Sequence, residues 1–60
     1  MEPTLYRAYA IGRDDRILSR VDLHCASDAD AIQRVQDLVD RHSMELWKGA
    51  QLLRKFAARQ

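Results

Sequence analysis

The spacing of the apolar residues changes twice along this sixty-residue chain, and this change limits the possible folds more than any other feature. From Leu5 to Cys25 and from Met44 to Phe56 the apolar residues follow the two-residue period of strands, whereas between Ala29 and His42 they follow helical spacing. Two strands, one helix and two strands are typical of an α+β domain with one helix on one sheet. We expect one small domain over residues 1–60, with an ordered core over about 4–57.

The N-terminal half predicts a β-hairpin. Residues 5–11 are rich in strand-forming types, and Gly12–Arg16 has turn chemistry, because Gly and Asp tolerate the dihedral angles that a hairpin needs. In residues 17–25 the side chains alternate between two sides. One side carries Ile17, Ser19, Val21, Leu23 and Cys25, and the other carries Leu18, Arg20, Asp22 and His24.

The middle of the chain predicts a helix from Ala29 to His42. Ser27 is a good N-cap, and Asp28 and Asp30 suit the positive end of the helix dipole. The apolar stripe consists of Ala31, Ile32, Val35, Leu38, Val39 and His42.

The C-terminal part predicts a second hairpin. Met44–Lys48 alternates, Gly49-Ala50 supplies a tight turn, and Leu52–Phe56 completes the pair. We expect Ala57–Gln60 to be frayed. A right-handed crossover through the helix predicts a ββαββ fold with a four-stranded antiparallel sheet of order 2-1-3-4. The helix would cover one face and leave the other bare.

The bare face is the predicted interaction surface. If Tyr6 faces the helix, alternate residues of the first strand face away, and residues of the other strands join them. The predicted surface consists of Arg7, Tyr9, Ile11, Arg20, Trp47 and Arg54, with Glu45 beside them and with Lys55 in place of Arg54 if the last strand takes the other register.

Three interpretations of this surface stay open. Trp, Tyr and Arg are the residue types enriched at protein interfaces, which favours contact with a protein. Aromatic side chains among arginines on an open sheet could equally stack single-stranded bases. In the third interpretation, Trp47 folds over the sheet edge into an ordinary core.

The sequence offers little for catalysis or metal binding. His24, Cys25 and His42 are the soft ligands, and the predicted fold keeps them apart, whereas zinc needs three or four that converge. Cys25 is either a small core residue or, near a helix start, a reactive thiol. Asp14-Asp15 predicts a turn rather than a calcium loop. We therefore expect no enzyme, no catalytic residue, no metal and no cofactor.

The small size and the single cysteine point to self-association. A chain of this length buries only about 60% of its unfolded surface, and its single cysteine excludes an internal disulfide, so we expect a homodimer. Ten Lys and Arg against nine Asp and Glu do not by themselves indicate nucleic acid. The basic residues that follow Glu45 are expected to be solvated.

Location is predicted from what the sequence lacks. Met1–Thr4 has neither the basic nor the apolar region of a secretory signal, and no apolar run reaches the roughly 18 residues of a membrane span. With one lone cysteine, these features predict a cytoplasmic protein without membrane contact.

Several short motifs resemble a family of very small proteobacterial proteins of the rhizobial type. The motifs are Tyr6-Arg7-Ala8-Tyr9, Gly12, Asp22-Leu23-His24-Cys25, Asp30-Ala31-Ile32, Leu38-Val39-Asp40 with His42, and Glu45-Leu46-Trp47-Lys48-Gly49. The resemblance covers residues 6–56 and consists of fold-determining positions, so it implies no activity, cofactor or catalytic residue. Arg41 departs from the glycine that the family pattern often has, which leaves the helix end less sharply defined.

Together these observations favour a bacterial protein-interaction or accessory module that is not an enzyme and that self-associates through its open sheet face or an edge. An unidentified protein partner is a further expectation. The alternative is a single-stranded nucleic-acid-binding module that uses Tyr9, Trp47 and the nearby arginines. A small regulator or toxin-system component is a third hypothesis, for which the sequence has no specific motif.

Overall fold

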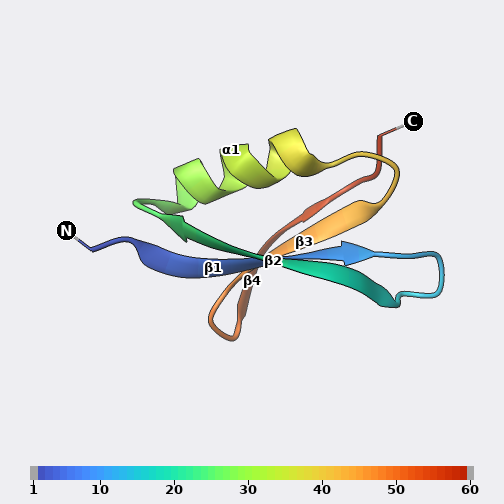
Figure 1. The fold of residues 1–60 in the computed structure, drawn as a ribbon, viewed down its shortest axis with the longest axis horizontal. Coiled ribbons are helices and arrows are strands. Elements are labelled where there is room, and N and C mark those ends of the chain that lie inside the picture. Colours follow the sequence, from blue (N-terminus) through green and yellow to red (C-terminus); the bar gives the residue numbers. More distant parts are fainter. Residues whose placement is uncertain (1, 60) are drawn as a thin grey trace.

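The structure is a computed structural model that describes residues 2–59. It confirms the predicted element order, which is ββαββ (Figure 1). The elements are β1 (Thr4–Ile11), β2 (Ile17–Cys25), α1 (Asp28–Leu38), β3 (Ser43–Lys48) and β4 (Gln51–Phe56).

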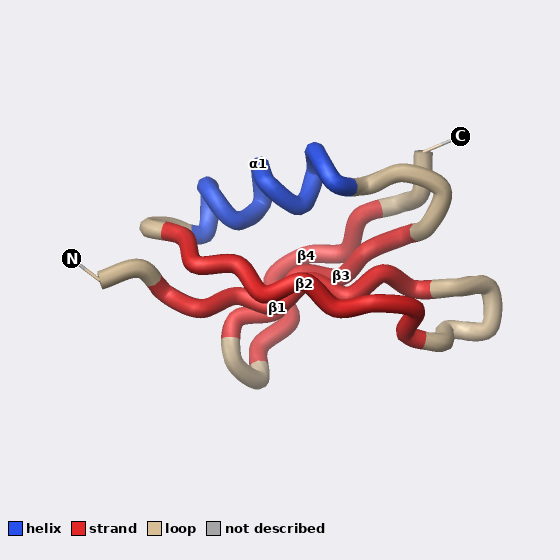
Figure 2. Tube along the Cα trace, in the orientation of Figure 1, coloured by secondary structure: helices blue, strands red, loops and turns tan. Residues whose placement is uncertain are grey.

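The four strands form one antiparallel sheet in the order β2-β1-β3-β4, which confirms the predicted topology. The chain leaves the sheet at the edge strand β2, passes through α1 and returns at β3 on the far side of β1. The helix therefore lies across one side of the sheet, and no other described element covers the opposite side (Figures 1 and 2).

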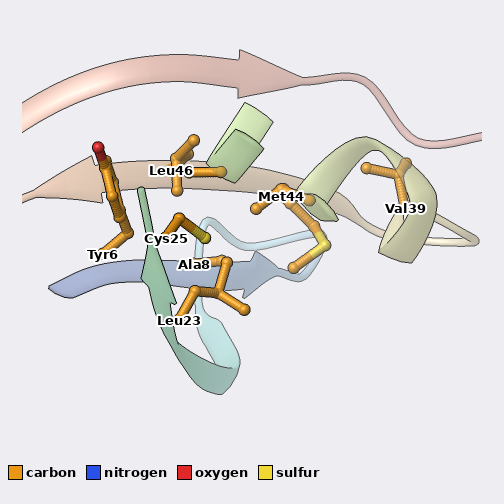
Figure 3. Close-up of a cluster of buried hydrophobic side chains, with 9 residues drawn as sticks. Tyr6, Ala8, Leu23, Cys25, Val39, Met44 and Leu46 are labelled. Atoms are coloured by element: carbon orange, nitrogen blue, oxygen red, sulfur yellow. The ribbon is translucent and has the colours of Figure 1, made fainter. Parts of the chain in front are cut away.

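The core lies between α1 and the sheet. The buried side chains from β1, β2 and β3 point toward one another under the helix (Figure 3). They are Tyr6, Ala8, Leu23, Cys25, Ala31, Val35, Val39, Met44 and Leu46. Two of these nine residues are alanines, so the core is thin, and Tyr6, Leu46 and Val35 supply its largest fully buried side chains.

The helix begins as predicted and ends earlier than predicted. The Ser27 hydroxyl accepts a hydrogen bond of 3.2 Å from the Asp30 N–H, as an N-cap does. The helix ends at Leu38, not near His42, because Val39 takes an extended conformation (φ −63°, ψ 132°). Val39 thereby buries its side chain, and residues 39–42 return the chain to the sheet for β3. Leu38 stays 49% exposed, outside the buried stripe.

Two irregularities in the strand pairing set which side chains share a face. Between β1 and β2 the register shifts so that Leu18 has no direct partner. Between β3 and β4 it shifts so that Leu53 has none. Each is a β-bulge, in which two residues of one strand lie opposite one residue of the other. The bulge at Leu53 reverses the alternation of the residues before it.

The C-terminal segment returns to the end of α1. The Arg59 N–H donates to the Asp40 carbonyl at 2.7 Å, and its guanidinium donates to the Gln36 carbonyl at 3.1 Å. The fraying of residues 57–60 stays a prediction, and Gln60 lies outside the described residues. Among residues 2–59, α1 is too short and too polar to cross a membrane.

Candidate functional site

The side of the sheet opposite α1 is the candidate functional surface, and we call it the open face. Residues directly opposite each other in antiparallel strands point to the same side, so the register identifies its members. It consists of Leu5, Arg7, Tyr9 and Ile11 of β1, Ile17, Arg20, Asp22 and His24 of β2, Ser43, Glu45 and Trp47 of β3, and Leu52 and Lys55 of β4.

The two aromatic residues of the open face lie on neighbouring strands. Tyr9 is opposite Glu45 and Arg7 is opposite Trp47, so Tyr9 and Trp47 are diagonal neighbours on the same side of the sheet. Both side chains are half-buried. The alternation in the sequence predicts this placement, because neither strand has a bulge between the residues concerned.

Trp47 belongs to the open face and not to the core. Its indole N–H donates a hydrogen bond of 3.2 Å to Glu45 Oε1, and the buried cluster does not include it. The interpretation in which Trp47 folds over the sheet edge into the core is therefore wrong. The Glu45 carboxylate holds the indole against the sheet and also adds a negative charge beside Tyr9.

The arginines of the open face are paired with an acid. Arg20 Nε lies 3.4 Å from Asp22 Oδ1, and Arg7 Nε lies 3.9 Å from the same oxygen. The three side chains are about half exposed, so the pairs are weak, but they reduce the positive potential of this surface. On β2 the open face therefore carries charges of both signs, one on Arg20 and one on Asp22.

Arg54 is the one predicted surface residue that the structure places elsewhere. It is opposite Leu46, which is buried beneath α1, and its guanidinium carbon lies 5.8 Å from the centre of the Phe56 ring. Arg54 therefore lies on the helix-covered side, and Lys55, opposite Glu45, takes the open-face position. The bulge at Leu53 leaves the pairing of Arg54 unchanged but moves Leu52 to the open face, opposite Trp47.

Several apolar side chains of the open face are exposed. Leu5 is 39% exposed, Ile17 is 58% exposed and Leu52 is 37% exposed. Ile11 is opposite Ile17 on one side and Ser43 on the other, which extends this apolar surface toward the β1–β2 turn. The prediction missed Leu5, although its alternation with Arg7 was a usable signal. It placed Ile17 with the core residues of β2 and missed Leu52, because no sequence signal indicates the bulges at Leu18 and Leu53.

The residues with candidate chemistry lie apart. Cys25 is 3% exposed and packs in the core as a free thiol, whereas His24 is opposite Leu5 on the open face. Within residues 2–59 no three His, Cys, Asp or Glu side chains come together as metal ligands would.

The carboxylate of Asp28 contacts two other elements on the helix-covered side of the sheet. The Tyr6 hydroxyl donates a hydrogen bond of 2.6 Å to Asp28 Oδ1, and Lys48 Nζ lies 3.5 Å from the same oxygen. The hydrogen bond to Asp28, with burial, raises the pKa of Tyr6 to about 12. The same hydrogen bond, with the charge of Lys48, lowers the pKa of Asp28 below its usual value. This contact joins β1, α1 and β3.

No protein family model, curated protein or solved structure matches this chain. The resemblance to the small proteobacterial proteins therefore stays a prediction, and the geometry of the sheet is the basis of the proposals below.

Proposed function

We propose that this chain is an interaction module, not an enzyme, and that it binds a second copy of itself through uncovered parts of its sheet, either the open face or an outer edge. One observation carries the proposal: five large apolar side chains are 37–58% exposed, three of them on the open face. The five are Leu5, Ile17, Leu18, Leu38 and Leu52. Contact with another chain would remove this apolar surface from water.

The small core supports the same proposal. A sixty-residue chain has little apolar burial to set against the entropy of folding, and a partner subunit is one of the few ways to add more. The open face also carries both signs of charge, since Arg7, Arg20 and Lys55 lie among Asp22 and Glu45. A surface with both signs can be complementary to itself, as a two-fold symmetric contact requires.

Sedimentation velocity over about a hundredfold dilution series tests the proposal, together with thermal melts at the same concentrations. We expect the sedimentation coefficient and the melting temperature to fall on dilution, because a dimer that dissociates loses the stability linked to association. A sedimentation coefficient of the monomer and a constant melting temperature at every concentration would contradict self-association.

Binding of single-stranded nucleic acid is the second candidate function. The shared side of Tyr9 and Trp47 favours it, because neighbouring aromatic rings can stack successive bases. Asp22 and Glu45 oppose it, since they place negative charge beside Arg7, Arg20 and the indole. Salt-dependent binding of random oligonucleotides that is lost in Trp47→Ala would support this function, and no binding at low salt would exclude it.

The proposal places the module in a reducing compartment, the cytoplasm. The free and buried Cys25 supports this location, because oxidising compartments favour paired cysteines.

A further inference from the structure

The outer edge of β2 is available for pairing with another strand. β2 is the first strand of the sheet order, so only its inner edge pairs with β1. Figure 2 shows β2 in front of the other strands, with no described segment across its outer edge. The strand has nine residues and contains neither proline nor glycine. Such an edge presents unpaired backbone N–H and C=O groups along its length.

The opposite edge of the sheet is less suited to pairing. β4 has six residues, and the bulge at Leu53 interrupts it. Two adjacent basic residues, Arg54 and Lys55, follow the bulge directly. Short strands, bulges and basic side chains are the features by which proteins prevent pairing at a sheet edge. β2 is longer, its bulge at Leu18 lies near its start, and its arginine, Arg20, is paired with Asp22.

The charge pattern of β2 selects one register for pairing with a second copy. A two-fold axis normal to the sheet keeps each side chain on its own face, so an antiparallel pair of identical strands must be centred on a residue. Val21 is the midpoint of Ile17–Cys25, and centring on it pairs residues 19–23 in regular alternation, with the bulge at Leu18 beyond them. This register places Arg20 opposite the partner's Asp22, and Asp22 opposite the partner's Arg20.

The other registers bring like charges together or separate the opposite charges. Centring on Arg20 places two arginines opposite each other, and centring on Asp22 does the same with two carboxylates. Directly opposed like charges are destabilising in sheets. Centring on Ser19 or on Leu23 does not bring Arg20 opposite the partner's Asp22, so both ion pairs of the Val21 register are lost.

We infer that two copies of this chain pair antiparallel along β2, centred on Val21, and join their sheets into one of eight strands. This inference rests on the proposed self-association and names the surface that carries it. Val21, which is half-buried on the helix-covered side, would be covered by the partner's Val21. Both open faces would lie on the same side of the joined sheet and stay free for a further partner.

Two opposite charge reversals test the register. In Arg20→Asp, positions 20 and 22 are both aspartates, so each faces an aspartate of the partner. In Asp22→Arg both positions are arginines, so each faces an arginine of the partner. At low salt we expect each variant alone to associate about tenfold or more weakly than the wild type, measured by sedimentation equilibrium. A one-to-one mixture of the two variants should associate again, because each aspartate then faces an arginine.

Arg54→Glu is the matched control, since it reverses one charge on β4, at the far edge of the sheet and on the helix-covered side, and should leave association unchanged. If both β2 variants associate normally, the β2 contact is overturned while self-association itself stands. The same conclusion follows if both associate weakly and mixing them does not restore association. A wild type that is monomeric at every concentration would overturn both the contact and the proposed function.

Hydrogen exchange on the wild type tests the same contact without a substitution, in case a charge reversal prevents folding. We expect amide protection in residues 17–25 to rise with protein concentration and protection in residues 51–56 to stay constant. Protection that rises in 51–56 and not in 17–25 would place the contact at β4 and overturn the inference.

Discussion

The hydroxyl of Tyr6 and the carboxylate of Asp28 form a hydrogen bond of 2.6 Å that joins the centre of the sheet to the first turn of the helix. The ring of Tyr6 is buried under α1, while Asp28 occupies the helix start next to the Ser27 cap. The contact therefore sets the position of the helix over β1. Its loss should affect stability and not the open face, which is on the opposite side.

Tyr6 should titrate well above an ordinary tyrosine. Its folded pKa of about 12 exceeds the ordinary value of 10.0, so its hydrogen bond contributes stability in full below pH 10 and loses it as the pH rises toward about 12. A near-ultraviolet titration of Tyr9→Phe, in which Tyr6 is the remaining tyrosine, measures this pKa. A midpoint near 10 while the chain is still folded would show that the hydrogen bond is absent.

Asp28 should make the protein less stable in acid. Its pKa is lowered from 3.8 in the folded state, so the stability it contributes is present above that value and is lost as the pH falls through the folded pKa. We expect Asp28→Asn to be less stable than the wild type near neutral pH and to depend less on pH near 4, in urea melts across this range.

The double variant Tyr6→Phe with Asp28→Asn separates this contact from unrelated effects. Two residues that stabilise through one shared hydrogen bond lose it once, so the double variant should be little less stable than Asp28→Asn alone, which also loses the charge beside Lys48. Fully additive losses would mean that the two residues act independently.

Leu46 should be among the most sensitive core positions. Its side chain is fully buried under α1, and Leu46→Ala should cost about 2–5 kcal/mol in the free energy of unfolding, which is a large share of the stability of so small a domain. Leu52→Ala, on the exposed open face, is the control and should cost less than about 1 kcal/mol. Similar urea midpoints for the two variants would contradict the position of the core.

Gly49 should resist replacement because of its backbone conformation alone. Its φ is +59°, and a Cβ built there would meet nothing within 4 Å, so the penalty is conformational and not steric. We expect Gly49→Ala to lose about 1–2 kcal/mol in thermal or urea unfolding. Gly49→Asn should lose less, because asparagine tolerates the left-handed region better. An alanine variant as stable as the wild type would mean that the β3–β4 turn changes its conformation.

The thiol of Cys25 should react only when the domain opens. Because the residue is 3% exposed in the core, we expect alkylation of the folded protein to be at least about a hundredfold slower than in urea. Equal rates under both conditions would instead indicate an accessible, reactive thiol, and with it the enzymatic interpretation that the sequence leaves open for this cysteine.

Much of the fold could be predicted from local patterns. The alternation of residues 19–25, the Ser27 cap and the Gly49 turn each depend on near neighbours in the chain, and each lies where the sequence predicts it. The bulge at Leu18 moves Ile17 to the open face, against the predicted alternation. The shared side of Tyr9 and Trp47 also follows, because strand alternation and topology suffice to place both residues.

The failures share a different origin. The helix ends at Leu38 because Val39 is buried by turning into the core, which depends on where β3 must begin. The faces of Leu52 and Leu53 depend on the bulge in β4, which turns Leu53 toward the core and Leu52 to the open face. Arg59 donates hydrogen bonds to carbonyl groups of residues 36 and 40, far from it in the chain. None of these contacts has a signal within a few residues of the position that it controls.

By itself the sequence determined the element types, their order and the antiparallel sheet, because short-range periodicity, capping and turn conformations act through neighbouring residues. Only the tertiary structure decided where α1 stops, that Lys55 and not Arg54 joins the open face, and how the tail docks on the helix. Those outcomes depend on contacts between segments distant in the chain, and at the end of α1 the burial of Val39 outweighs the local preference for helical spacing.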